Sequence, residues 1–431
     1  MPYRAQEDDL LDGEAAIVRR PPFGSNPTVG ERGSDTQRRI LDAALEVFAD
    51  VGFHDARVEL ITKRAGCSRP AFYQYFSSKD DVFWKLASRL GEAMVALGDD
   101  LGTITPDDRG VEALARWLDD FARLHDEHAP VFSAFQAAAR EGGLLTTRSR
   151  GISDRLGEAL IAASGSTDLD HLANGIVAVL IRCNFYRFNG AGSVDRDRLN
   201  QGLAQVVHRV LVGPIQGVNV KPAPGGSRRR RRRTADAPTG EPDRPLRPRG
   251  EKTRQRLLDA GAAVLPIRGY HDARVDDIVE TAGVSHGSFY RYFENKDDFF
   301  RVLAEQASSR MIELLDAFPS ADDAEGLHRW LQEWFAAYRS NGGVISTWQE
   351  MQQSDPRLQD FSLGVAAAVL ERLMRILGDR GFGDAGVDAL ALLAVVERLP
   401  YSVFTLHFAN EAEAIDAMAV IIRRGFMAID A

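Results

Sequence analysis

The chain has 431 residues, a formal net charge of −9 at pH 7, 44% hydrophobic and 27% charged residues. This is the composition of an ordinary globular protein with room for several domains, and the charge excludes a globally basic coat for nucleic acid. No apolar run reaches the ~20 residues that a membrane-spanning helix needs. Because Cys67 and Cys183 are the only cysteines, a disulfide framework or zinc cluster is excluded, and we expect no cofactor and a reducing, cytoplasmic compartment.

The first segments of the chain predict a polar leader followed by short helices. Residues 1–33 lack the apolar core of a signal peptide. The next run, "TQRRILDAALEVFADVG", places its apolar residues on one helical stripe, and Gly52 should end that helix. A second helix in "RVELITKRAGCS" should end at Gly66, and Ser68 can cap a third helix that carries Pro70 in its first turn. No convincing alternating strand pattern occurs, so the predicted fold is all-α.

The same pattern returns in the second half of the chain. An offset of 217 aligns residues 32–83 with residues 249–300 without gaps, and about half of the positions are identical. The offset becomes 213 around Trp117 and Trp330, and 216 around Arg182 and Arg398. This is a duplication of one unit of roughly 200 residues, which is too long for a solenoid repeat.

Residues 214–250 separate the halves and are rich in Pro, Gly and Arg, including six consecutive arginines at 228–233. This composition predicts a disordered linker. The arginines either add sequence-independent contacts to DNA phosphates or are simply solvated. In full, we expect a leader at 1–33 and, after it, two copies of a DNA-binding head and a helical regulatory domain, joined by the linker. The heads are expected at 34–94 and 251–311, with helix-turn-helix motifs at 57–76 and 274–293. The regulatory domains are expected at 95–213 and 312–431.

A helix, a glycine-containing turn and a second helix form the helix-turn-helix geometry, in which the second helix enters the major groove of DNA. The runs "VELITKRAGCSRPAFYQYFSSKDDVF" and "VDDIVETAGVSHGSFYRYFENKDDFF" resemble the tetracycline-repressor-like (TetR) family of bacterial regulators. The resemblance covers each three-helix head in detail and the remainder of each half in helical character and length. It implies a one-component transcription regulator that binds double-stranded DNA and is released by a small-molecule effector.

The residues of each motif fit this interpretation. Phe72 and Phe76 lie four apart and should pack the recognition helix onto the core of the head. The resemblance implies that Tyr73, Lys79 and their counterparts contact the DNA backbone, and a tyrosine that only fills the core is the alternative. The Thr or Ser that usually begins the first helix of the motif is absent, so the neighbouring arginine could contact phosphate and Asp55 or Asp272 could cap the helix. The complete set of candidate DNA-binding residues is Arg57, Ser68, Arg69, Ala71, Tyr73, Gln74, Tyr75, Lys79, Arg274, Ser285, His286, Ser288, Tyr290, Arg291, Tyr292 and Lys296.

The positions that should read bases differ between the copies. Early, exposed positions of the recognition helices carry different side chains, and Arg and Gln favour different bases. The heads are therefore expected to recognise unlike half-sites, unless one of them has lost DNA binding. These reading residues are Arg69, Pro70, Ala71 and Gln74 in the first head and His286, Gly287, Ser288 and Arg291 in the second.

In the regulatory domains, Arg182 and Arg398 each lie in an otherwise apolar helix. A buried arginine needs a partner, either an acid such as Glu397 or an anionic ligand, and the ion pair is favoured. Aromatic residues nearby are candidates for a ligand pocket, with a plain hydrophobic core as the alternative. They are Trp117, Phe121, Phe132, Phe135, Phe185 and Tyr186 in the first half and Trp330, Trp334, Tyr338, Trp348, Tyr401 and Phe404 in the second.

The last helices of each half are apolar enough to pair with one another. In the family such helices join two chains, but with both heads on one chain the pairing is expected within the chain, as a pseudo-dimer, or between chains, as a homodimer. The predicted function is a ligand-responsive repressor whose heads read unlike half-sites. The alternative is an architectural DNA-binding protein without an effector, and an enzyme is disfavoured because no catalytic or phosphate-binding motif is found.

Overall fold

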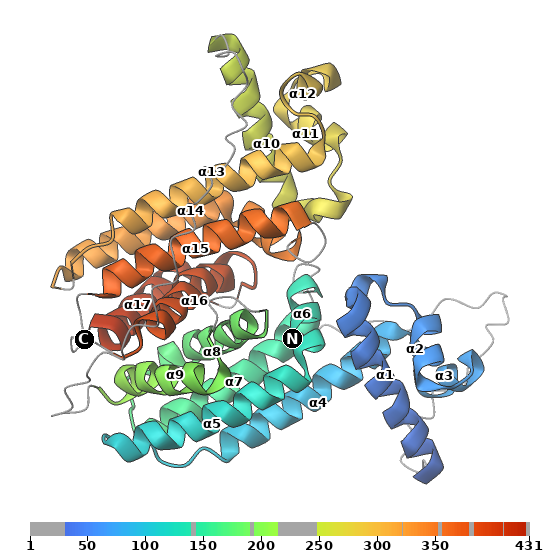
Figure 1. Ribbon diagram of the computed structural model, residues 1–431, viewed down its shortest axis with the longest axis vertical. Coiled ribbons are helices and arrows are strands. Elements are labelled where there is room, and N and C mark those ends of the chain that lie inside the picture. The colour runs from blue at the N-terminus through green and yellow to red at the C-terminus, as the bar shows by residue number, and fades with distance from the viewer. Residues whose placement is uncertain are drawn as a thin grey trace, which may run out of the picture. The chain divides into compact units, whose positions relative to one another are not determined.

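A computed structural model of the chain describes residues 31–138, 144–189, 194–213, 248–320, 322–351, 356–378, 383–407 and 409–427. The described residues form helices and connecting turns, and none of them forms a strand, which confirms the all-α prediction (Figure 1). The chain divides into two compact units, one ending at Ser88 and one beginning at Arg89. Residues 214–247 of the predicted linker (214–250), with its six arginines, lie outside the described residues, and its last three residues, 248–250, begin the helix α10 (Pro248–Asp272).

The first unit is the first head. It contains α1 (Glu31–Asp55), α2 (Val58–Ala65), α3 (Arg69–Tyr75) and the beginning of α4 (Lys79–Asp99). The predicted apolar stripe of α1 is buried, with Ile40, Leu41 and Ala44 fully enclosed. Because α4 runs without interruption through Ser88, this compact unit ends inside a helix, and the limit of the head at residue 94 stays a prediction.

The second unit begins with the first regulatory bundle. Its helices are α5 (Asp108–Glu127), α6 (Ala129–Ala138), α7 (Leu144–Ser164), the short η2 (Asp170–Leu172), α8 (Ala173–Phe188) and α9 (Arg196–Leu211). Helices α5 and α9 pack closely, and α7 packs on α8. Asp107 and Asp195 cap α5 and α9 by accepting hydrogen bonds from backbone N–H groups of the first turn.

The second head belongs to the same unit. It comprises α10 (Pro248–Asp272), α11 (Val275–Ala282), α12 (His286–Tyr292) and α13 (Lys296–Asp316). The second regulatory bundle follows as α14 (Ala324–Met351), α15 (Pro356–Gly378), α16 (Ala385–Phe404), α17 (Glu411–Ile422) and a final π-helical turn, η4 (Arg423–Met427). Helix α14 packs against both α10 and α13, so the second head shares its core with its regulatory bundle.

Within the second unit, the two regulatory bundles contact each other through α8 and α9 of the first half and α16, α17 and η4 of the second (Figure 1). The approach of α9 to α16 is close, because a Cβ atom added to Gly202 would lie 2.5 Å from Cγ1 of Val387. Polar contacts reinforce this apolar interface. The Arg198 guanidinium pairs with Asp384 at 2.8 Å, and Arg424 donates a 2.9 Å hydrogen bond to the Val210 carbonyl.

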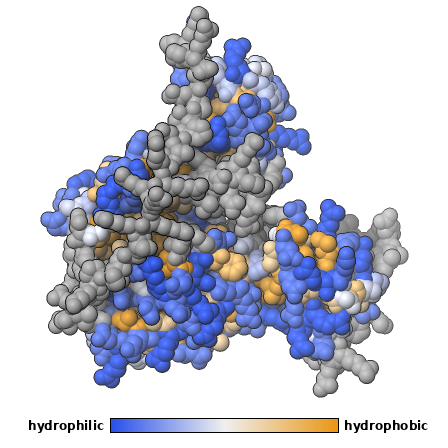
Figure 2. All heavy atoms as spheres, viewed as in Figure 1, coloured by the Kyte–Doolittle hydropathy of each residue, from blue (hydrophilic) through white to orange (hydrophobic). Residues whose placement is uncertain are grey.

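The surface in view is mainly hydrophilic over the described helices, with smaller apolar areas between them (Figure 2). In the described part of the chain, no helix is long and apolar enough to cross a membrane.

Candidate nucleic-acid interface

The turn of each helix-turn-helix motif is built around a glycine with a left-handed backbone. Gly66 has φ 62° and ψ 38°, and Gly283 has φ 61° and ψ 42°, a conformation that glycine adopts without steric cost. The helices end where the sequence predicted. The next residue closes each turn, since the N–H of Cys67 donates to the Thr62 carbonyl at 3.0 Å and that of Val284 donates to Val279 at 3.0 Å.

An arginine from the first helix of each head fixes this turn. Arg39 donates through Nε and Nη2 to the Ala65 carbonyl, at 3.2 and 2.6 Å, and through Nη2 to Gly66 at 3.1 Å. Arg256 does the same for the carbonyls of residues 282 and 283 in the second head. The sequence interpretation missed both arginines, although their identity at the offset of 217 could have identified them.

The recognition helices α3 and α12 are anchored by phenylalanines. Phe72 and Phe289 are fully buried and Phe76 and Phe293 nearly so, which confirms the predicted packing. In the second head, the rings of residues 289 and 293 also contact Phe299 at 5.3 and 4.8 Å between centroids. With one face held this tightly, the opposite face of each short helix is presented to solvent.

Two phenols stand on that exposed face. Tyr73 is 45% exposed and Tyr290 is 53% exposed, whereas Tyr75 and Tyr292 are half-buried. An exposed phenol on a recognition helix can donate its O–H to a DNA phosphate. This placement suits the expected backbone contacts of residues 73 and 290, which remain predictions.

The two lysines have a structural role that the sequence did not suggest. The ammonium of Lys79 donates to the carbonyls of Phe53 and Ala56 at 2.7 and 3.1 Å and lies 4.7 Å from the centre of the Phe53 ring. Lys296 makes the same contacts in the second head, with carbonyls of residues 270 and 273 at 2.8 and 3.1 Å. Burial lowers the pKa of both ammonium groups. Each lysine thus holds the end of the first helix against the start of the fourth, and the predicted phosphate contact remains a prediction.

The first residue of each recognition helix is held by an acid from the preceding helix. The Arg69 guanidinium lies 2.7 Å from the Glu59 carboxylate, and Nε2 of His286 lies 3.1 Å from Asp276. These ion pairs are exposed and hence weak. Arg69 could therefore leave the Glu59 carboxylate and contact the edge of a DNA base at little cost in free energy. Among the other residues predicted to read bases, Gln74, Pro70, Gly287 and Arg291 are exposed and Ala71 and Ser288 are partly exposed.

The caps of the motif differ from the expectation. Arg57 and Arg274 occupy the N-cap positions of α2 and α11 with exposed side chains, and neither Asp55 nor Asp272 provides the cap. In the second head, the carboxylate of Asp277 accepts the Arg274 N–H at 2.8 Å. The aspartates precede the extended N-cap residue, and a side chain three residues inside the helix reaches that N–H better. At the caps of the recognition helices, Oγ of Ser68 accepts the Ala71 N–H at 3.2 Å, whereas Ser285 contacts the Ser288 hydroxyl at 2.9 Å.

Most of the predicted pocket tryptophans have structural partners. The indole N–H groups of Trp117, Trp330 and Trp334 donate to the carbonyls of residues 97, 314 and 396 at 2.8, 2.7 and 2.8 Å. Trp117 also lines a cavity of about 690 Å³ between α4 and α5. Phe121 and Phe132 are buried, whereas Phe185 is half-buried against the Arg182 guanidinium. The side chains of Phe135 and Trp348 lie outside the described residues.

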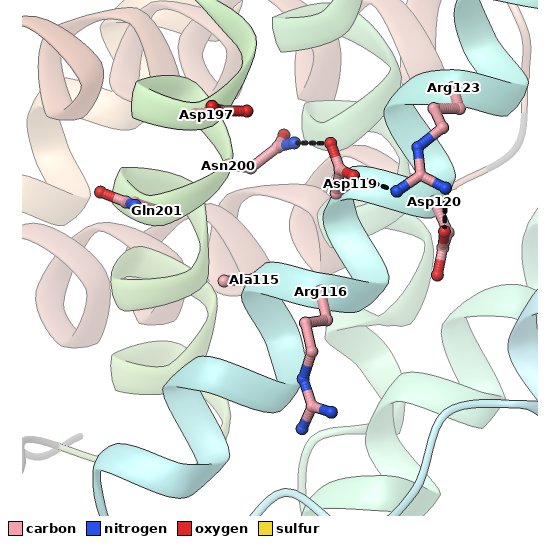
Figure 3. Close-up of a pocket in the computed structure, with 8 residues that line it drawn as sticks. All are labelled: Ala115, Arg116, Asp119, Asp120, Arg123, Asp197, Asn200 and Gln201. Atoms are coloured by element: carbon pink, nitrogen blue, oxygen red, sulfur yellow. Dashed lines mark hydrogen bonds and ion pairs between the residues drawn. The ribbon is translucent and has the colours of Figure 1, made fainter.

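A separate hollow of about 400 Å³ lies on the surface between α5 and α9 (Figure 3). Several charged and amide side chains lie along it: Arg123 pairs with Asp119 and Asp120, and Asn200 donates to Asp119 at 3.4 Å. None of the predicted pocket residues lines this hollow.

Arg182 is buried, with 3% of its side chain exposed, and its Nε donates to Glu397 at 3.1 Å. The predicted acidic partner is therefore confirmed for Arg182. The hydroxyl of Tyr186 donates to the same carboxylate. Because Glu397 belongs to α16, this cluster joins the first half of the chain to the second.

The two motifs, their buried aromatic anchors and their exposed reading helices define a helix-turn-helix DNA-binding protein. The family of bacterial regulatory proteins named tetR matches the chain twice, at residues 40–85 and 257–303. The chain is also 35% identical over 127 residues to the uncharacterized HTH-type transcriptional regulator TtgW of Pseudomonas putida, covering 28% of this chain and 88% of that protein. The chain belongs to the TetR family of transcriptional regulators and carries two of its DNA-binding heads.

Other similar proteins cover different parts of the chain. The HTH-type transcriptional activator FasR of Mycolicibacterium smegmatis is 27% identical over 204 residues, which span 46% of this chain and 93% of FasR. The uncharacterized regulator YdgC of Bacillus subtilis is 39% identical over 72 residues, which span 17% of this chain and 37% of YdgC. Among solved structures, FadR of B. subtilis in complex with stearoyl-CoA shares 22% identity at a TM-score of 0.34, covering 39% of this chain and 97% of FadR.

Proposed function

We propose that the chain is a ligand-responsive repressor whose two heads bind the unlike half-sites of one operator. The observation that carries this proposal is the combination of shared scaffold and different reading residues. Phe72 and Phe289 are equally buried, and Lys79 and Lys296 make equivalent contacts, yet Gln74 is replaced by Arg291 on the exposed face. Glutamine suits adenine and arginine suits guanine, so the preferred bases should differ.

We further propose that the two halves pair within one chain, as the two subunits of a homodimer would. The support comes from the packing of α8 and α9 on α16 and α17, with ion pairs at Arg182–Glu397 and Arg198–Asp384. Two heads carried by one chain would then lie about one DNA turn, ~34 Å, apart on the operator. Repression would be relieved by an effector that binds the released form better than the DNA-bound form. We accordingly propose that the protein acts in the bacterial cytoplasm, where it binds DNA.

The test is selection of bound duplexes from a random pool at ~150 mM salt, with the wild-type chain. Two unlike half-motifs separated by about one helical turn support the proposal. A palindrome would contradict it, because one head would then dominate and two chains would pair. Tight binding without any motif would favour an architectural protein that uses sequence-independent phosphate contacts.

A measurement of mass distinguishes the internal pair from a dimer of chains. The proposal predicts one chain per selected operator duplex, by light scattering or native mass spectrometry at micromolar protein. Two chains per duplex would overturn the internal pairing while leaving DNA recognition intact.

A further inference from the structure

Arg398 on α16 is an arginine without a hydrogen bond or ion pair within the described residues. Its Nε is enclosed by protein and has no hydrogen-bond partner. Its guanidinium carbon lies 4.3 Å from the centre of the Tyr401 ring, so the guanidinium rests on the face of a phenol ring. Arg398 is half-buried, and a guanidinium that is partly withdrawn from water is costly unless a carboxylate or another anion compensates its charge.

The duplication explains why this compensation is missing. Arg182 and Arg398 occupy equivalent positions at the offset of 216, and Arg182 pairs with Glu397 across the two halves. The position equivalent to Glu397 in the first half is Ile181. The reciprocal ion pair therefore cannot form, and Arg398 is left without a carboxylate of its own.

A second polar atom without a partner lies on the neighbouring helix α14. Tyr338 is 1% exposed, and its hydroxyl has no hydrogen-bond partner. Native structures rarely leave a buried hydroxyl unpaired, and such a group needs an explanation. The pKa of this phenol is raised by burial first, and it is also influenced by the nearby charges of Tyr401, Arg398 and Arg182, which places these groups in one electrostatic cluster.

The equivalent position in the first half has a different chemistry. At the offset of 213, Tyr338 corresponds to His125, which is 1% exposed and whose two ring nitrogens also have no hydrogen-bond partner. Burial lowers the pKa of this imidazole to about 4, so it is neutral at pH 7. The nearby Arg187 is neutralised by Asp126. The first half therefore has a neutral imidazole in place of the Tyr338 hydroxyl, and its own arginine at the position of Arg398, Arg182, is paired with Glu397.

We propose that Arg398, the Tyr338 hydroxyl and the unpartnered Nη1 of Arg182 bind the carboxylate of a small organic acid with an apolar body. One negative charge matches the excess of one positive charge left by two arginines and Glu397. The hydroxyl and the guanidinium groups would donate to the carboxylate oxygens. The apolar body would lie against Phe404, whose ring stacks on that of Tyr338 at 6.2 Å. This inference rests on the proposed function, since the acid would be the effector.

The test measures binding of hexanoate and benzoate to the full chain by isothermal titration calorimetry, with hexanamide and benzamide as uncharged controls. We expect one site per chain that accepts the acids and not the amides. Arg398→Met should weaken binding at least about tenfold, because it removes the charge-assisted hydrogen bonds. Tyr338→Phe should weaken binding several-fold, and it will fold because the hydroxyl it lacks has no partner in the protein.

Two further variants sharpen the result. Ile181→Glu supplies the missing carboxylate and should abolish acid binding by pairing with Arg398. His125→Phe, at the position of the first half that corresponds to Tyr338, should leave acid binding unchanged. Equal binding of acid by wild type and Arg398→Met, equal binding of acid and amide, or no binding of either acid at millimolar concentration overturns the site.

Operator binding by the same preparations separates this site from the proposed function. If the chain binds the selected operator but neither acid, the proposed regulatory function stands and the proposed acid site is wrong. If the chain binds acid and Arg398→Met weakens that binding as expected, but the chain binds no operator, the proposed acid site stands and the proposed regulatory function is wrong.

Discussion

Glu397→Gln tests whether a buried ion pair holds the two halves of the chain together. The substitution removes the charge that compensates Arg182, whose side chain is only 3% exposed, and weakens the acceptor of the Tyr186 hydroxyl. Breaking one partner of a buried pair typically costs about 3–5 kcal/mol, because the remaining charge stays buried. We therefore expect the unfolding transition of the regulatory bundles to lose about that much, measured by urea titration with far-ultraviolet circular dichroism.

Two comparisons make this prediction specific. Replacing both partners, as Arg182→Met with Glu397→Leu, should recover most of the loss because no uncompensated charge remains. Arg123→Gln is the control on the surface, where the exposed pairs with Asp119 and Asp120 should contribute little to stability because solvent screens them. A loss below about 1 kcal/mol for Glu397→Gln, or a double variant no more stable than the single one, would refute the reasoning.

The remaining predictions concern the heads and the inter-half contact. Lys79→Met and Lys296→Met should each destabilise a head by about 1–3 kcal/mol in thermal unfolding, because two backbone carbonyls lose a charged donor. Unchanged stability with weaker DNA binding would instead mean that the lysines serve only to contact DNA phosphates. Tyr73→Phe and Tyr290→Phe should weaken operator binding several-fold in a gel-shift titration without changing the unfolding temperature, and a lower unfolding temperature would contradict their exposure. Asp388 of α16 lies 3.4 Å from the Arg209 guanidinium of α9, across the two halves. Burial raises the pKa of Asp388 from 3.8 to about 7, so the folded chain binds more protons than the unfolded chain between these values. Urea midpoints should therefore fall as pH rises through that window, and Asp388→Asn should flatten this dependence.

The all-α fold and the glycine turns could be predicted from the sequence because their determinants are local. Gly66 and Gly283 end helices, and Phe72 and Phe76 lie four apart, so spacing alone indicates the turn and the buried face. The duplication strengthened this prediction by presenting the same pattern twice.

The roles that depend on distant contacts could not be predicted. Lys79 reaches carbonyls 23 and 26 residues earlier in the chain, and nothing in the local sequence indicates that reach. The sequence suggested Glu397 as an acid for a buried arginine, but not that the pair would join the halves, since that depends on how α8 packs on α16. Nothing in the sequence singled out His125, and Tyr338 was a candidate pocket aromatic without any sign that its hydroxyl would lack a hydrogen-bond partner.

The central claim is that each head reads its own half-site, and exchanging the reading residues tests it most directly. The four reading residues of the first recognition helix would be replaced by those of the second, at 286, 287, 288 and 291, and bound duplexes would again be selected at ~150 mM salt. The account predicts that the wild-type motif of two unlike halves becomes a motif of two like halves at the same spacing. An unchanged motif would contradict it, because the first head would then contribute no base recognition.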